Sequence, residues 1–168
     1  MRRHVRPFIA RHEPPGSLLS HLKSGSGAVV AMSAVGGLSM LTGLPLLVAP
    51  LGATAVLLFG QPSSPLAQPA NVLGGYLVAT VLAVVAMSAF PGLWPAAIVA
   101  VGLSIAAMLV LRVTHPPAGA IPLVASAASS TGGAMLFGII LLGSLSLVAL
   151  AILHHRLPPR AQYPRHID

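Results

Sequence analysis

Long apolar segments separated by short polar breaks make up most of the chain. We expect six helical segments, at about 27–43, 46–60, 70–90, 94–112, 117–129 and 134–154. No Asp, Glu, Lys or Arg stands between Lys23 and Arg112, and none stands between Arg112 and Arg156. Since a helix needs about 20 apolar residues to cross a bilayer, the first gap has room for about four spans and the second for about two. The pattern predicts an all-α membrane protein.

The second and fifth segments are short and are interrupted by proline. Pro45 and Pro50 flank the start of the second, and Pro116 and Pro117 precede the fifth. Proline removes a backbone donor and breaks a helix. Short segments broken by Pro or Gly at corresponding places in two halves of a chain indicate a transport site. We therefore expect two half-helices in a transporter-like arrangement.

The two halves come into register when the chain is shifted by 67 residues. Pro50-Leu51-Gly52-Ala53 then falls on Pro117-Ala118-Gly119-Ala120, so both breaks carry the pattern P-x-G-A. The expected plan is two three-segment repeats, 27–90 and 94–157. With three crossings each, the repeats would have opposite orientation.

The charged residues gather at the two ends, and the formal net charge is +7. We expect a basic arm over 1–24, a transmembrane domain over 25–157 and a basic tail over 158–168. Because basic residues remain on the cytoplasmic side, both termini should be cytoplasmic in a multi-pass protein of a bacterial-type inner membrane. Six crossings place Arg112 on that side as well. Re-entrant short segments would leave four crossings, so four, five or six spans stay open.

Within the basic arm, Ser17 is expected to cap a short helix. Leu18, Leu19 and Leu22 share one face of it, which is typical of a helix that lies on the bilayer surface.

The composition argues against several classes of protein. The chain is 55% hydrophobic and 7% charged, whereas soluble domains carry about 25% charged residues. It has no cysteine, and its only acids are Glu13 and Asp168. Thiol nucleophiles, carboxylate pairs and metal-ligand sets are therefore missing, so we expect no enzyme, no metal and no cofactor. Few aromatic residues accompany the basic ones, which argues against nucleic-acid binding.

The candidate functional residues concentrate at the second break. Apart from Arg112, His115 is the only Arg, Lys, His, Asp or Glu between Lys23 and His154. A histidine at membrane depth can bind an anion, gate by protonation or couple a proton; alternatively it caps the preceding helix. Gly119 is expected to permit a close backbone approach. The N–H groups at the start of each half-helix favour an anion.

Polar groups also collect between the second and third segments, over 61–71. They form either a substrate vestibule or an ordinary loop with Asn71 capping the next helix. Thr54 and Tyr76 could face the same polar path, whereas His154 and His155 are expected to be interfacial. The predicted substrate-binding set is Pro50, Gly52, Ala53, Thr54, Gln68, Asn71, Thr114, His115, Pro116, Pro117, Gly119 and Ala120.

Four stretches of this sequence resemble the HPP family of integral membrane proteins. They are His115-Pro116-Pro117-Ala118-Gly119-Ala120, the stretch 50–60, the stretch 63–69 and Asn71-Val72-Leu73-Gly74-Gly75. The resemblance covers about 15–157. The third helix of that family often begins Gly-Gly-His, whereas this chain has Gly74-Gly75-Tyr76.

The resemblance implies a small inner-membrane protein, described with four or five spans, and points to nitrite transport, with which plastid and cyanobacterial relatives are associated. We therefore expect a transporter or channel for a small inorganic anion, nitrite first, bound between opposed half-helix N-termini. The slim bundle also predicts a homo-oligomer in the lipid bilayer. The alternative is a membrane scaffold or regulatory subunit that transports nothing.

Overall fold

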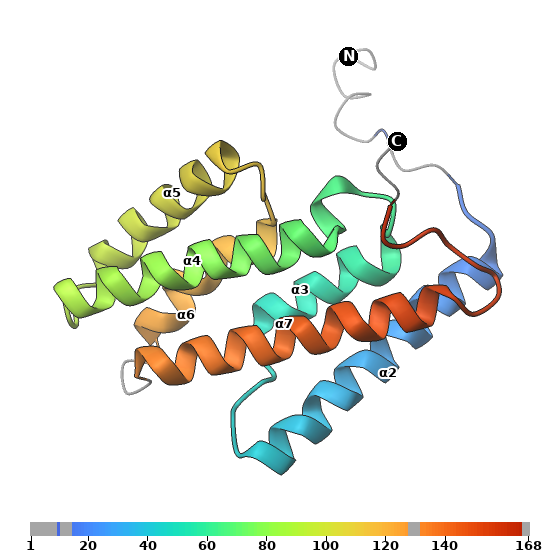
Figure 1. Ribbon diagram of the computed structural model, residues 1–168, viewed down its shortest axis with the longest axis horizontal. Helices are drawn as coiled ribbons and strands as arrows, with labels where there is room; N and C mark the ends of the chain where they lie inside the picture. Colours follow the sequence, from blue (N-terminus) through green and yellow to red (C-terminus); the bar gives the residue numbers. More distant parts are fainter. Residues whose placement is uncertain (1–9, 11–14, 128–131, 166–168) are drawn as a thin grey trace, which may run out of the picture.

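The computed structural model describes residue 10 and residues 15–127 and 132–165, and these residues form helices and connecting loops without strands (Figure 1). The α-helices are α2 Leu18–Thr42, α3 Ala49–Ala55, α4 Pro69–Ala89, α5 Trp94–Val110, α6 Ile121–Ala127 and α7 Gly133–His155. A π-helical turn, η1 Val56–Gly60, extends α3. Two 3₁₀ turns, η2 Pro65–Ala67 and η3 Pro116–Ala120, precede α4 and α6. The expected all-α class is confirmed.

Prolines fix where most of these helices begin. Pro stands in the first turn of α3, α4, α5 and η3, where its missing N–H is not needed and its fixed φ suits a helix. At the end of α2, Gly43 has φ 70° and donates its N–H to the Ser39 carbonyl. A residue with this left-handed backbone is the usual end of a helix.

The separate surface helix expected in the basic arm is not formed. Ser17 caps a helix as predicted, accepting a hydrogen bond from the Ser20 N–H at 3.2 Å. That helix is α2, which continues without a break to Thr42. The glycines and serines over 24–27 lower helix propensity, but no proline stands there to stop the helix. The boundary predicted at 24/25 therefore lies inside one helix.

The remaining segments match the prediction to within a few residues, but the second and the fifth are not α-helical throughout. The fifth, expected over 117–129, begins one residue earlier with the 3₁₀ turn η3 and continues as α6 to Ala127. Residues 128 and 129 lie outside the described residues. The Ala118 N–H donates to the His115 carbonyl at 3.0 Å, three residues back, which is the hydrogen bond of a 3₁₀ turn.

Three of the described helices are long and apolar enough to cross a membrane: α2, α4 and α7. The segment Ala49–Gly60 and α5, Trp94–Val110, are apolar but shorter. A membrane-spanning helix needs about 20 residues. This is therefore a membrane protein in which long helices accompany shorter ones.

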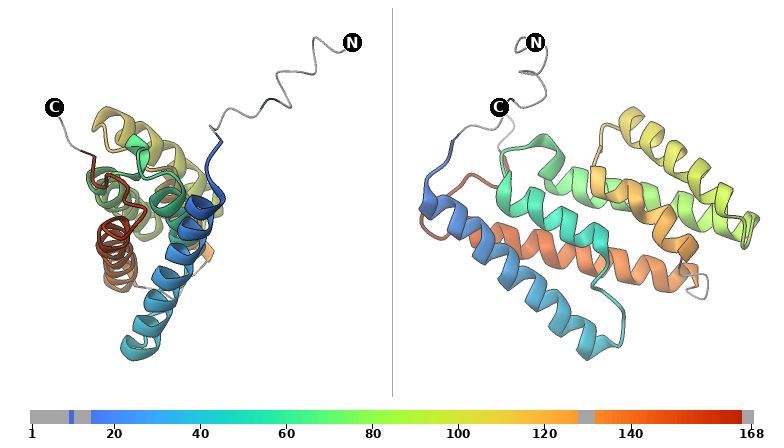
Figure 2. Two further views of the ribbon diagram at one scale, coloured as in Figure 1. Left: turned by 90° about the vertical axis from the view of Figure 1, so that its right-hand side faces the viewer. Right: turned by 180° about the vertical axis from the view of Figure 1, so that it is seen from behind.

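The helices form a bundle in which α4 contacts α5, α6 and α7, while α2 packs on α7. Seen from behind, α2 and α3 lie in front of α7 (Figure 2). The segment α3–η1 runs toward the end of the bundle where α2 begins, and α6 runs toward the opposite end (Figure 1). The Lys23 Nζ donates to the Leu157 carbonyl at 2.6 Å, so the start of α2 and the end of α7 lie together.

Candidate functional site

Three buried polar side chains from three parts of the chain meet at the Thr54 hydroxyl. The Thr54 Oγ1 lies 2.6 Å from the Tyr76 hydroxyl on α4 and 2.8 Å from the His115 Nε2. Thr54 and His115 are fully buried and Tyr76 is 1% exposed. We call Thr54, Tyr76 and His115 the hydroxyl–imidazole cluster. It joins α3, the first Pro-broken segment, to His115, the residue that precedes the second.

The second ring nitrogen of His115 is fixed by the loop before α4. Its Nδ1 lies 2.8 Å from the Leu66 carbonyl oxygen. Because a carbonyl only accepts, this nitrogen must carry a proton and donate it. The sequence offered no signal for Leu66, since the contact uses its main chain.

The cluster can hold His115 in two protonation states without moving a heavy atom. When the ring is neutral, the Thr54 hydroxyl donates to Nε2 and accepts from Tyr76. When the ring is charged, Nε2 donates to Thr54, whose proton turns to the Pro50 carbonyl at 3.1 Å. A hydroxyl has one donor and two acceptor positions, so both patterns satisfy every group.

A glycine on α4 makes the close approach that the cluster requires. A Cβ added to Gly75 would lie 2.7 Å from the His115 Cβ and 3.0 Å from the Val113 carbonyl oxygen. The sequence prediction assigned this role to Gly119, and that was wrong: a Cβ there would meet no atom within 4 Å. Gly119 stands in the 3₁₀ turn η3 and is only partly buried.

Asn71 lies beside the cluster and holds its backbone. Its Nδ2 donates to the Thr114 carbonyl at 3.0 Å. This hydrogen bond tethers Thr114, the residue before His115, to the first turn of α4. Asn71 thus ties two segments together rather than capping α4. The Thr114 hydroxyl lies 3.5 Å from the Met108 carbonyl, so it turns back toward α5.

Gln68 organises its own loop and does not reach the cluster. Its Nε2 donates to the carbonyls of Pro62 and Ser64 at 3.0 and 2.9 Å. Its Oε1 accepts from the Arg165 N–H at 2.8 Å. This loop supplies the Leu66 carbonyl to His115, so Gln68 supports the cluster indirectly.

The remaining predicted residues frame the cluster without adding a polar side chain to it. Pro50 is buried and offers its carbonyl to Thr54, while Ala53 is exposed and points away. Pro117 is buried, whereas Pro116 is exposed. Partly buried residues complete the two breaks: Gly52, Gly119 and Ala120. The hydrogen bond that joins the two breaks runs between the Thr54 side chain and His115, and not between two helix N-termini.

The tail after α7 folds back over the loop that carries Leu66. The Tyr163 hydroxyl donates to the Ala67 carbonyl at 3.0 Å, and Tyr163 is 7% exposed. Burial raises the pKa of this phenol above its usual value. The tail predicted to start at 158 therefore packs on the bundle at least as far as Arg165.

The end of α7 carries a buried histidine. His155 is 4% exposed, and its Nε2 lies 2.8 Å from the Leu58 carbonyl oxygen. The π-helical turn η1 leaves carbonyls without regular α-helical partners, and a histidine on the neighbouring helix can serve one of them. In the described part of the chain, no group of three His, Asp or Glu side chains could hold a metal ion.

Comparison with known proteins agrees with this architecture. The model described as "HPP, transmembrane region" matches residues 13–164. Two transmembrane proteins of Dictyostelium discoideum are each 31% identical, over 67% and 72% of this chain. The matches cover 38% and 45% of those relatives, so the chain spans less than half of their length. No solved structure matches.

Proposed function

The chain belongs to the HPP transmembrane family, and from the geometry of its buried cluster we propose that it transports a small inorganic anion, with nitrite as the first candidate. The substrate binds at the hydroxyl–imidazole cluster of Thr54, Tyr76 and His115. The protein moves the anion across the membrane without converting it chemically.

The observation that carries the proposal is His115, buried and hydrogen-bonded on both ring nitrogens. Its hydrogen bonds accommodate a proton on each nitrogen. A charged ring in an apolar interior is costly unless an opposite charge lies beside it. The chain has no carboxylate between Glu13 and Asp168, so an anionic substrate is the available counter-charge.

The surroundings of the cluster fit a transport site. Thr54 belongs to one Pro-broken segment and His115 directly precedes the other. Such broken helices near the middle of a bundle are the usual position of substrate sites in secondary transporters. The opposite directions of α3–η1 and α6 support the proposed plan of two inverted repeats.

The mechanism follows from the closed state of the cluster. Thr54 and His115 are fully buried, so the anion must enter through an opening movement of the loop that carries Leu66 or of the segments that carry Thr54 and His115. On entry, the anion accepts hydrogen bonds from His115 and Tyr76 in place of Thr54. A proton and the anion then cross the membrane together, so the net transport is that of the protonated acid.

The membrane arrangement proposed for this function places both termini in the cytoplasm of a bacterial-type inner membrane. The basic residues at the joined ends of α2 and α7 support that orientation. The proposed assembly is a homo-oligomer, because a bundle with three long spans gains from a neighbouring copy that shields it. Lipid covers the rest of the apolar surface.

The test is anion flux into proteoliposomes that contain the purified protein. Nitrite, nitrate, formate and chloride are offered at two pH values, and His115→Ala is compared with His21→Ala, an exposed histidine outside the cluster. We expect saturable nitrite flux that His115→Ala lowers at least tenfold and His21→Ala leaves unchanged. Both variants must elute as monodisperse protein.

Absence of flux from folded wild-type protein would overturn the transport proposal and favour a scaffold or regulatory subunit. Equal flux from wild type and His115→Ala at both pH values would remove His115 from the mechanism.

A further inference from the structure

One buried hydroxyl in the helices differs from the others. Thr80, on α4, is 1% exposed, and its Oγ1 is buried without a hydrogen-bond partner among the described residues. The other buried Ser and Thr hydroxyls of the described helices lie within hydrogen-bonding distance of a carbonyl three or four residues back: Thr54 with Pro50, Ser104 with Ala100 and Ser144 with Leu141. Thr80 therefore keeps a hydroxyl proton available for an acceptor that the described residues do not supply.

The Thr80 side chain lines a small cavity between α4 and α7. The cavity has a volume of about 40 Å³, which exceeds the roughly 10–15 Å³ needed to hold one water. Its polar side chains are Tyr76, Thr80 and Ser144, and its apolar walls come from both helices. Because Tyr76 also belongs to the hydroxyl–imidazole cluster, the cavity adjoins the proposed substrate site.

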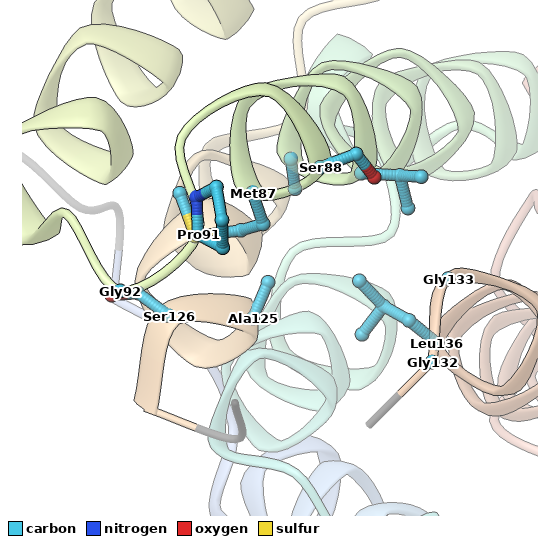
Figure 3. A pocket seen from close by; sticks show the side chains of 11 residues that line it. Met87, Ser88, Pro91, Gly92, Ala125, Ser126, Gly132, Gly133 and Leu136 are labelled. Carbon is cyan, nitrogen blue, oxygen red and sulfur yellow. The ribbon is translucent and has the colours of Figure 1, made fainter. Parts of the chain in front are cut away.

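A larger pocket lies further along the same two helices. It has a volume of about 260 Å³ (Figure 3). Its lining comes from one face of α4, from the turn after α4, from the end of α6 and from the start of α7: Ala83, Val84, Met87, Ser88, Pro91, Gly92, Ala125, Ser126, Gly132, Gly133 and Leu136. On α4, positions 76, 80, 83 and 87 follow one face at intervals of three or four residues. On α7, Leu136 lines the pocket, whereas Phe137 and Ser144 line the cavity.

The pocket, the cavity and the cluster thus occupy successive turns of α4. We propose that the Thr80 hydroxyl is a binding station for a small hydrogen-bond acceptor that travels between the pocket of Figure 3 and the hydroxyl–imidazole cluster. The inference rests on the proposed function and adds the route. The acceptor is the transported anion or its acid.

The size of the cavity selects the ligand. About 40 Å³ admits one water or an anion of very few atoms, and its lining carries no charged side chain. The station therefore holds its ligand by hydroxyl groups alone. It slows large or strongly hydrated anions without trapping small ones.

The experiment replaces the hydroxyl while keeping the shape. Thr80→Val removes it, Thr80→Ser keeps it, and Ser104→Ala is the control that removes a buried hydroxyl on α5 from outside the cavity. Nitrite flux is measured in proteoliposomes. The melting temperature, Tm, is measured in detergent with and without nitrite.

We expect Thr80→Val to lower nitrite flux about tenfold, because one hydrogen bond to the anion is lost. We also expect it to raise the Tm by about 2–4 °C without nitrite, because an unpaired buried hydroxyl is removed and no bond is broken. Thr80→Ser should keep the flux, and Ser104→Ala should leave the flux unchanged without raising the Tm.

The outcomes separate the station from the transport proposal. Wild-type flux that Thr80→Val leaves unchanged, or a lower Tm in Thr80→Val, overturns the station and leaves the transport proposal intact. No wild-type flux, with a nitrite-dependent rise in Tm that Thr80→Val abolishes, overturns transport and supports the station as a binding site. No flux and no nitrite-dependent rise overturn both.

Discussion

Replacing Gly75 by alanine is the sharpest test of how α4 is seated on the segment before η3. The added Cβ would lie 2.7 Å from the His115 Cβ, whereas carbon atoms in good contact stand about 3.5–4.0 Å apart. The shortfall is therefore about 1 Å. Neither the His115 Cβ nor the Val113 carbonyl, 3.0 Å from the new atom, can rotate away, because both are fixed by the backbone.

The helix or the segment must move by about 1 Å, which costs roughly 1–3 kcal/mol in a packed core. Movement of the segment stretches the 2.8 Å bond between His115 and Thr54, and movement of α4 stretches the 2.6 Å bond between Tyr76 and Thr54. Either loss adds a cost of about 0.5–1.5 kcal/mol. Alanine returns about 1 kcal/mol through its higher helix propensity. The expected net loss in the free energy of unfolding is about 2 kcal/mol.

The assay is thermal unfolding of purified protein in detergent, with Gly102→Ala as the matched control. Gly102 is exposed on α5, and a Cβ there would meet no atom within 4 Å, so this variant should be stabilised by up to about 1 kcal/mol. For a chain of this size the Gly75→Ala loss corresponds to a Tm lower by about 4–8 °C. If Gly75→Ala melts together with Gly102→Ala, the close approach at His115 is not real.

Three further changes test the cluster, the tail and the first helix by the same thermal assay. Thr54→Val leaves His115 and Tyr76 without their shared partner and should lower the free energy of unfolding by about 1–3 kcal/mol; unchanged stability would contradict the hydrogen bonds. Tyr163 has a raised pKa in the fold, so its stabilisation is present below the unfolded pKa of about 10 and is lost at higher pH. Tyr163→Phe should cost about 1 kcal/mol at neutral pH and remove part of the alkaline loss; an identical alkaline profile would refute the burial of the phenol. Ser17→Ala should cost about 1 kcal/mol through the lost cap, and no change in Tm would show that α2 does not depend on it.

The sequence predicted the helices well because few signals compete with them. Gaps without charge and prolines in first turns determine where most segments begin, and Trp94 and Pro69 mark starts within one residue of the prediction. The start of α2 was missed because Lys23 and the neighbouring small residues resemble a polar break. A single charge at a helix end does not interrupt the backbone hydrogen bonds.

The candidate site was predicted in its side chains and missed in its main chain. Thr54 and His115 stood in the two Pro-broken motifs, and the structure brings them to 2.8 Å. The Leu66 carbonyl and the close approach at Gly75 depend on how α4 packs against two other segments, which no local pattern encodes. Gln68 and Asn71 were named as substrate contacts because they are polar, yet their amides bind main-chain carbonyls.

The tail has a consequence for the order in which the protein matures. The loop that offers the Leu66 carbonyl to His115 is held by Tyr163 and by the Arg165 N–H. During synthesis the loop emerges from the ribosome about a hundred residues before Tyr163 and Arg165 do. The hydrogen bond between His115 and the Leu66 carbonyl is therefore fully supported only after the last helix is inserted and the tail has packed on the loop. Newly made chains pass through an intermediate in which the helices are inserted and this loop is not yet held in place.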